Sequence, residues 1–229
     1  MARIPHHNLT SEISQYIGDL MATLGSTGKA EAQNFDNKRK LFLVPNLPIP
    51  PEIQEKHQPL LTKYRNQIQD NIDSLEKSLG PVRHVFHELI HESGEKGLDA
   101  LDAISPLYKP ICERICKSSG TFVATDNQQL LFQMMDLQRC LSVGLISQEV
   151  YKIISEAFEK TISDRNEFIF KIIDENIKEN EVGLLFISED HKIQFSTDIQ
   201  VFYISPPTHS ELKSLITDFY AVKKDSQTE

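Results

Sequence analysis

The sequence predicts an α/β protein whose sheet is mainly parallel and covered by helices on both faces. Short apolar runs rich in β-branched and aromatic residues alternate along the chain with longer segments of helical periodicity. No internal repeat or low-complexity tract interrupts this alternation. Strands that alternate with helices are typical of a parallel sheet buried between two helical layers.

The chain of 229 residues is long enough for one large domain or two small ones. No strong linker divides it. We therefore expect an N-terminal helix and linker over residues 1–40, one α/β domain over residues 41–222, and a disordered tail over residues 223–229.

The first elements follow from periodicity and from glycine and proline. Residues 9–24 carry apolar side chains at helical spacing, and the glycines of GSTG end that helix. LFLV (41–44) predicts a short strand, because the prolines after it exclude a helix interior. Helical periodicity returns over residues 51–79, and Gly80-Pro81 closes that helix.

The middle and end of the domain repeat the alternation. Residues 92–97 contain a glycine turn, and residues 98–117 are helical with breaks expected at Pro106 and Pro110. The remaining expected elements are strands over 121–125, 182–188 and 198–205, and helices over 126–141, 148–178 and 209–222.

Composition excludes several classes of function. The formal net charge of −9 argues against a nucleic-acid partner and gives no attraction to anionic membranes. No apolar run is long enough to span a bilayer, and the N-terminus lacks the apolar core of a signal peptide. Three cysteines do not form a disulfide framework. We therefore expect a soluble protein of the reducing cytoplasm.

The segment VRHVFHELIH (82–91) contains an H-E-x-x-H motif, in which two histidines bind zinc and the glutamate activates water. If residues 82–91 are helical, His87 and His91 lie one turn apart, and Glu113 is a candidate third ligand. The valines, phenylalanine and isoleucine equally favour a strand, which would point Glu88 away from both histidines. The sequence leaves both alternatives open.

A second candidate site follows from the strand ends. His87 and Glu88 follow the apolar residues of 82–86, Asp126 follows the strand over 121–125, and His191 comes shortly after the strand over 182–188. Because the carboxyl ends of parallel strands share one edge, these four side chains are candidates to bind a divalent metal.

Glu88 and His191 are also candidates for acid–base catalysis, and Arg165 for binding an anionic substrate or pairing with one of the acids. Structural roles compete with these assignments: Asp126 is also a good helix N-cap, and Glu189-Asp190 is compatible with a solvated turn. Cys112, Cys116 and Cys140 are compatible with a soft-metal site or with small buried apolar residues. These three cysteines are the chain's full set.

Several phrases together resemble a group of uncharacterised bacterial proteins with no assigned function: KLFLVPNLPIPPEIQEKH, GPVRHVFHE, GEKGLDAL, MDLQRCLSVGLIS and GLLFISEDHKIQFSTDIQVFYISPP. The likeness covers nearly the whole chain and includes no recognised catalytic motif. In that group the pattern keeps His87-Glu88 and Gly94-Glu95, whereas His91 is peculiar to this chain. The resemblance therefore implies that H-E-x-x-H is not a zinc motif here.

Two segments show a fainter resemblance to erythromycin-esterase-like and TraB-like proteins. They are Arg165-Asn166-Glu167-Phe168 and the strand from Gly183 to His191. That broad group includes metal-dependent hydrolases, so the likeness implies metal-assisted hydrolysis.

Three functional hypotheses follow. The leading one is small-molecule binding or metal-assisted hydrolysis at the carboxyl ends of the strands. A non-catalytic interaction or assembly protein is the alternative, with the helix over residues 9–24 docking on a partner or a second copy. The zinc hydrolase is the third.

Overall fold

The computed structural model describes residues 38–225 of the chain. The expected N-terminal helix over residues 9–24 lies outside this range, as do the last four residues of the expected tail. The docking role assigned to that helix therefore stays a prediction.

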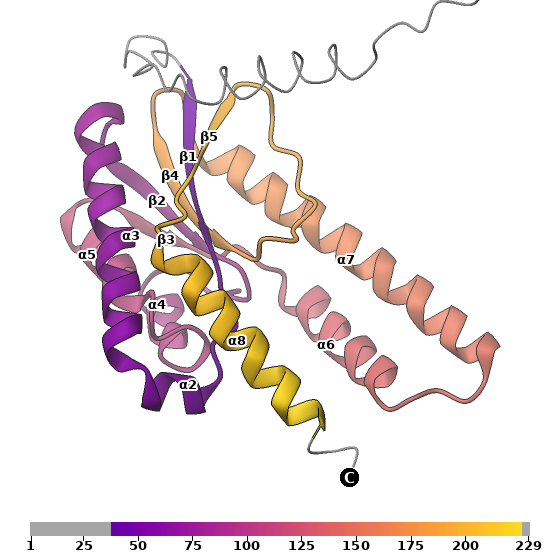
Figure 1. The fold of residues 1–229 in the computed structure, drawn as a ribbon. Helices are drawn as coiled ribbons and strands as arrows, with labels where there is room; N and C mark the ends of the chain where they lie inside the picture. The colour runs from indigo at the N-terminus through magenta and orange to yellow at the C-terminus, as the bar shows by residue number, and fades with distance from the viewer. Residues whose placement is uncertain (1–37, 226–229) are drawn as a thin grey trace, which may run out of the picture. The chain divides into compact units, whose positions relative to one another are not determined.

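A five-stranded sheet with all strands parallel forms the centre of the described part, in the order β3-β2-β4-β1-β5. This confirms the α/β fold class (Figure 1). The strands are β1 (Arg39–Pro45), β2 (Val82–His87), β3 (Thr121–Val123), β4 (Val182–Ile187) and β5 (Ile199–Tyr203). The helices are α2 (Pro51–Lys56), α3 (Gln58–Leu79), α4 (Gly94–Ile104), α5 (Lys109–Ser118), α6 (Gln128–Ser142), α7 (Gln148–Asn176) and α8 (Thr208–Asp225).

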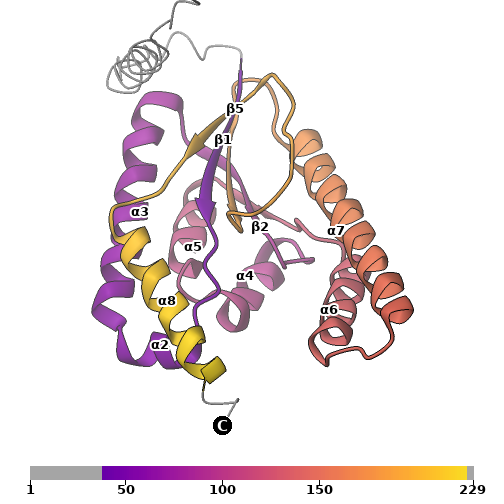
Figure 2. The ribbon, with the colours of Figure 1, turned by 45° about the vertical axis from the view of Figure 1, so that its right-hand side comes forward.

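Side chains that alternate along β1 divide the core into two layers. Phe42 and Val44 pack against α2, α3, α4, α5 and α8 on one face of the sheet. Leu41 and Leu43 pack against α7 and the connection 188–198 on the other face. In Figure 2, α3 and α8 lie on one side of the strands and α7 lies on the other.

The handedness of the crossovers explains this division. From β1 through β2 to β3 the chain moves in one direction across the sheet, and from β3 through β4 to β5 it moves back. Because a connection between parallel strands is almost always right-handed, the two sets of connections must lie on opposite faces. Accordingly α3, α4 and α5 cover one face, and α7 and the connection 188–198 cover the other.

Several expected boundaries need correction. The helix expected over 51–79 is broken at His57, because Pro59 begins a new helix there. The turn expected over 92–97 is already helical from Gly94, whereas the break expected near Pro106 and Pro110 is found. The strand expected over 121–125 ends at Val123, and Asn127, not Asp126, caps α6 by accepting a hydrogen bond from the backbone N–H of Leu130.

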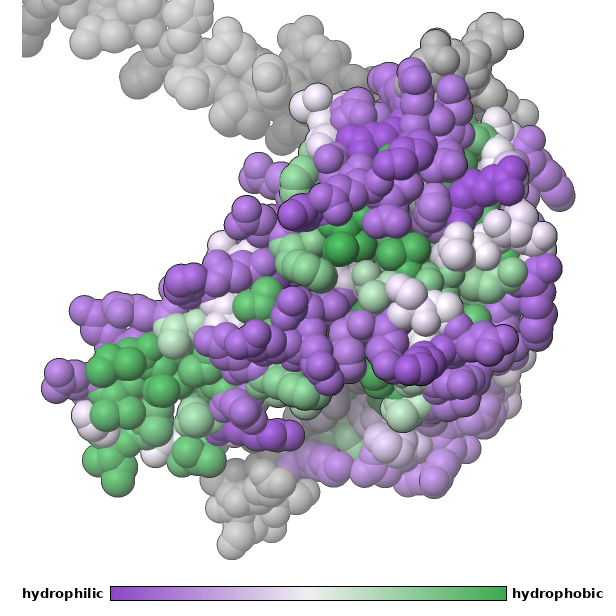
Figure 3. Space-filling view, turned by 180° about the vertical axis from the view of Figure 1, so that it is seen from behind, coloured by the Kyte–Doolittle hydropathy of each residue, from purple (hydrophilic) through white to green (hydrophobic). Residues whose placement is uncertain are grey.

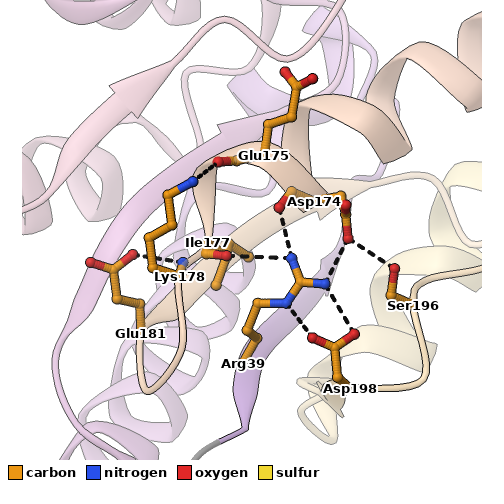
Figure 4. Close-up of polar contacts among 8 residues, drawn as sticks. All are labelled: Arg39, Asp174, Glu175, Ile177, Lys178, Glu181, Ser196 and Asp198. Atoms are coloured by element: carbon orange, nitrogen blue, oxygen red, sulfur yellow. Dashed lines mark hydrogen bonds and ion pairs between the residues drawn. The ribbon is translucent and has the colours of Figure 1, made fainter.

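At the amino edge of the sheet, Arg39 of β1 makes a group of polar contacts (Figure 4). Its guanidinium donates to both carboxylate oxygens of Asp198, at 2.7 and 3.0 Å, and to the carboxylate of Asp174 at 2.6 Å. It also donates to the backbone carbonyls of Asp174 and Ile177 at the end of α7. A cation is favourable at that position because helix carbonyls carry partial negative charge. Arg39 thus ties β1, α7 and the connection before β5 together.

Across residues 38–225, no helix is both long enough and apolar enough to cross a membrane.

We expect Arg39→Gln to lower the free energy of unfolding by about 1–2 kcal/mol at neutral pH. Hydrogen bonds from Arg39 lower the pKa of both Asp174 and Asp198. A lowered carboxyl pKa adds stability above the ordinary value of about 4, and that stability is lost as the pH falls through the folded-state pKa. The deficit of the variant should therefore shrink in acid, which urea denaturation at about pH 7 and about pH 3 measures.

The matched control for that series is Arg83→Gln, because Arg83 is exposed on β2. We expect this change to alter stability by no more than about 0.5 kcal/mol. A deficit of Arg39→Gln that is the same at both pH values would contradict the assignment.

Candidate functional site

Polar side chains from four strand ends meet at the carboxyl edge of the sheet. Asn46 follows β1, Glu88 follows β2, Asp126 comes after β3, and Ser188 follows β4. Ligands of open α/β sheets bind at this edge, in the crevices between connections that leave toward opposite faces. The parallel strands therefore bring together residues that are far apart in the chain.

Glu88 lies at the centre of this group. One carboxylate oxygen accepts a hydrogen bond from the amide of Asn46 at 2.9 Å, and the other lies 3.4 Å from the hydroxyl of Ser188 and 3.6 Å from the guanidinium of Arg165. Burial raises the pKa of Glu88, and this effect exceeds the lowering by the charge of Arg165 and the hydrogen bond from Asn46. The carboxyl group thus binds a proton more readily than an ordinary glutamate.

Arg165 lies on the buried face of α7 and forms an ion pair with Asp126. Its Nε donates to Asp126 Oδ2 at 2.7 Å, and its Nη2 lies 2.6 Å from the same oxygen. Burial lowers the pKa of Arg165, but the hydrogen bond and charge of Asp126 outweigh it and the pKa is raised overall. Arg165 was expected either to bind an anionic substrate or to pair with one of the acids, and the geometry shows that it pairs with Asp126.

The loop that carries Glu88 is held in an uncommon conformation. Leu89 has a φ of +70°, a left-handed backbone that a leucine rarely adopts. Its N–H donates to Asp126 Oδ2 at 3.0 Å, and the carbonyl of Ile90 accepts from the N–H groups of Thr125 and Asp126 at 2.9 Å. Strained residues that neighbouring groups hold in place are common at functional sites. Asp126 therefore fixes both the guanidinium and the turn next to Glu88.

His87 is fully buried, and its ring stacks on Phe186 and lies near Tyr108. Nδ1 contacts the backbone carbonyl of Glu88, so Nδ1 carries the proton. Nε2 has no hydrogen-bond partner. Burial lowers the pKa of His87 to about 4, and the imidazole is therefore neutral at pH 7.

The structure corrects the helical alternative for H-E-x-x-H. Residues 82–87 form β2 and a turn follows, so His87 and His91 do not lie one helical turn apart. The ring of His91 instead contacts Phe132, and Glu113 on α5 pairs with Lys109 and Lys117. The geometry that the zinc-hydrolase motif requires is absent from this segment.

Among the described residues, His191 makes no hydrogen bond or ion pair with Glu88. Its backbone N–H donates to the carbonyl of Ser188, its ring contacts Phe195, and burial lowers its pKa. Within residues 38–225, no three histidine, cysteine, aspartate or glutamate side chains are grouped so that they could hold a metal ion. The expected set of His87, Glu88, Asp126 and His191 is therefore not assembled in this geometry, and Cys112, Cys116 and Cys140 are free thiols.

A second polar network at the same edge was not expected from the sequence. The hydroxyl of Tyr64 lies 3.1 Å from His209 Nδ1, and His209 Nε2 lies 3.0 Å from Glu189. Lys213 donates to the other carboxylate oxygen of Glu189 at 2.5 Å. Tyr64 lies on the buried, apolar face of α3, where the other buried side chains carry no polar group. The hydroxyl of Tyr64 was therefore the only sign in this helix of a buried hydrogen bond. The acid at position 189 is paired in this network rather than simply solvated.

A surface groove of about 660 Å³ runs between α7 and the connection 188–198. Both α7 and the connection contribute apolar and polar side chains to its lining, among them Phe158, Ile162, Asn166, Phe170, Lys192 and Ile193. Asn166 follows Arg165 directly in the chain, which places the groove beside the helix turn that carries the ion pair.

No family model, no curated protein and no solved structure matches this chain.

We expect Asp126→Asn to lower the free energy of unfolding by about 3–5 kcal/mol, because it leaves the buried guanidinium of Arg165 without its partner. Chemical denaturation measures the loss. Adding Arg165→Met to Asp126→Asn should recover part of it, because the uncompensated charge is then removed.

Asp102→Asn is the matched control for that measurement. Asp102 also lies 2.5 Å from a cation, Lys109, but its side chain is exposed. We expect this change to cost no more than about 1 kcal/mol. Equal losses for Asp102→Asn and Asp126→Asn would contradict the importance of the buried pair.

His87→Phe should change how stability depends on pH. An unfolded histidine has a pKa of about 6.5, so protonation favours the unfolded chain until the folded pKa of about 4 is reached. The wild type should therefore lose about 3 kcal/mol, relative to the variant, as the pH falls from about 6.5 to about 4. Unfolding curves of both proteins across this range test it; parallel curves would show that His87 is not a neutral buried group.

Proposed function

We propose that this protein binds a small polar molecule at the carboxyl edge of its sheet and hydrolyses it with Glu88 as the general base. In this reaction Glu88 takes a proton from a water molecule as the water attacks the substrate, and then returns a proton to the leaving group. Arg165 and Asp126 act as positioning residues for the carboxyl group and its loop.

The single observation that carries the proposal is the environment of Glu88. A carboxyl group that is mostly buried at the carboxyl edge, with a raised pKa, is suited to accept a proton at neutral pH. Its side chain keeps 7 % of its surface exposed, so it remains at the solvent side of the edge. Asn46 and Ser188 orient its two oxygens.

The groove beside α7 supports the binding part of the proposal. Its volume of about 660 Å³ is within the range of small-molecule sites, and it combines apolar and polar side chains. The connection 188–198 contributes both to the groove, through Lys192 and Ile193, and to the contacts of Glu88, through Ser188. A ligand in the groove would therefore lie against the segment that orients the base.

The metal-assisted form of hydrolysis is not part of this proposal. The candidate ligands do not form a three-ligand group within the described range, so no step is assigned to a metal. We also propose a reducing, cytoplasmic location, which fits the three free thiols.

We expect Glu88→Gln to lower kcat/KM for a hydrolysed substrate by about 100-fold or more, the usual contribution of a general base. A panel of p-nitrophenyl esters and phosphates provides the first substrates. For the wild type, kcat/KM should rise as the pH rises through the raised pKa of Glu88, because only the ionised carboxylate accepts a proton. The variant should lack this limb of the profile.

Glu181→Gln is the matched control, because Glu181 precedes β4 at the opposite, amino edge of the sheet, where it contacts His84. This variant should keep the wild-type rate. A substrate that the wild type and Glu88→Gln hydrolyse equally fast would overturn the assignment of Glu88. Metal content of the purified wild type, measured by mass spectrometry, shows separately whether a metal takes part.

A further inference from the structure

The helical hairpin formed by α6 and the first half of α7, residues 128–160, has almost no buried side chain of its own. Leu131 is buried, but no residue from 132 to 160 is. The second half of α7 differs, because Thr161, Arg165, Ile169 and Ile173 are buried against the sheet. The outer part of the hairpin therefore lacks the packed face that ordinarily stabilises helices in proteins.

Large apolar side chains cover this outer part and are exposed. Figure 3 shows them gathered at the end of the hairpin, away from the sheet. Ile146, in the turn between the helices, is 99 % exposed. The patch, called the hairpin patch below, consists of Phe132, Met135, Val143, Ile146, Val150, Tyr151 and Ile153. A contiguous apolar patch of this kind marks an interaction surface.

The amino-acid composition of α6 is typical of a surface that is buried in a protein–protein interface. Of its 15 residues only Asp136 and Arg139 are charged, and these two form an ion pair with each other at 3.1 Å. Interface cores are depleted of charged residues and enriched in methionine and phenylalanine, and α6 contains Met134, Met135 and Phe132.

We propose that the hairpin patch binds the hairpin patch of a second copy of the chain, so that two hairpins form a four-helix bundle around a two-fold axis. From the exposed fractions of its side chains, the patch presents on the order of 800 Å² per copy, an upper value for the area that one interface buries and close to what each partner contributes to a standard stable interface. A two-fold dimer uses the same patch on both copies, so one patch supplies the whole interface.

Charge also favours a second copy as the occupant. The whole chain carries a net charge of −9, which opposes association of most of its surfaces. Residues 128–160 contain four acidic and three basic side chains, so the hairpin is close to neutral. The hairpin also lacks the excess of lysine and arginine with which amphipathic helices bind anionic lipid.

The test measures the mass of the full-length chain by sedimentation equilibrium between about 1 and about 100 μM, a range that separates weak from stable dimers. We expect a dimer for the wild type. Tyr151→Glu places two negative charges in the two-fold interface, and it should raise the dimer dissociation constant at least about tenfold.

Tyr220→Glu is the control, because Tyr220 on α8 is 51 % exposed, as is Tyr151. This variant should dimerise like the wild type. Equal melting temperatures for the two variants at concentrations where both are monomeric would show that neither change unfolds the chain. A second hairpin variant, Ile146→Glu in the fully exposed turn between the helices, should reproduce the effect of Tyr151→Glu.

Two results would overturn the proposal. The first is a wild-type chain that stays monomeric at the highest concentration, including one that instead sediments with vesicles of phosphatidylcholine and phosphatidylserine. The second is a dimer that Tyr151→Glu and Ile146→Glu leave intact.

Discussion

The buried guanidinium of Arg165 imposes the strictest constraint on the carboxyl edge. A cation taken out of water must be paired, and Asp126 supplies the pair at 2.6 Å. The same carboxylate accepts the N–H of Leu89 and so holds the left-handed residue after Glu88. One acidic side chain thus couples α7, the end of β3 and the loop of the proposed base. Burial of Glu88 beside this pair raises its pKa against the lowering effect of the charge of Arg165, because a more exposed carboxyl would be solvated and ordinary.

The two ends of the sheet are organised in different ways. At the amino edge, Arg39 is surrounded by two partly exposed aspartates and by the carbonyls that end α7, and its hydrogen bonds lower the pKa of both aspartates. At the carboxyl edge, one guanidinium faces two acids and one of these acids has a raised pKa. A carboxyl group whose pKa is raised by burial is more typical of functional sites than of structural ion pairs. The edge predicted for function by the direction of the strands is thus also the edge with the carboxyl group whose pKa is raised.

Much of the fold was predictable from the sequence because periodicity and apolar runs reflect burial directly. LFLV and GLLFIS are buried on both faces, and such runs identify strands of a parallel sheet. Segment 82–91 was ambiguous because a short apolar run with two histidines suits a strand or a helix equally well. Its β-branched and aromatic residues, buried on both faces of β2, were the physical signal for a strand.

The sequence predicted which residues of the candidate site meet only where a regular element fixes the position of the residue. Glu88 and Asp126 lie one to three residues beyond strand ends, and Arg165 lies on the buried face of a long helix, so their meeting follows from the topology. His191 lies four residues beyond β4, in a connection without regular structure, and its place could not be deduced. The contact between Tyr64 and His209 joins residues 145 positions apart and depends on how α3 and α8 pack.

The position of β1 in the sheet has a consequence for how the chain folds during synthesis. Of the strands in residues 38–225, β1 is made first, yet its two neighbours are β4 and β5, so Lys40 pairs with Val182 and Gln200. Contacts this distant in sequence slow folding, because a long loop must close before they form. By contrast, β2 and β3 with α4 and α5 are neighbours in sequence and in space. Until the last fifth of the chain leaves the ribosome, both edges of an apolar strand stay unpaired, which is a condition under which nascent chains aggregate.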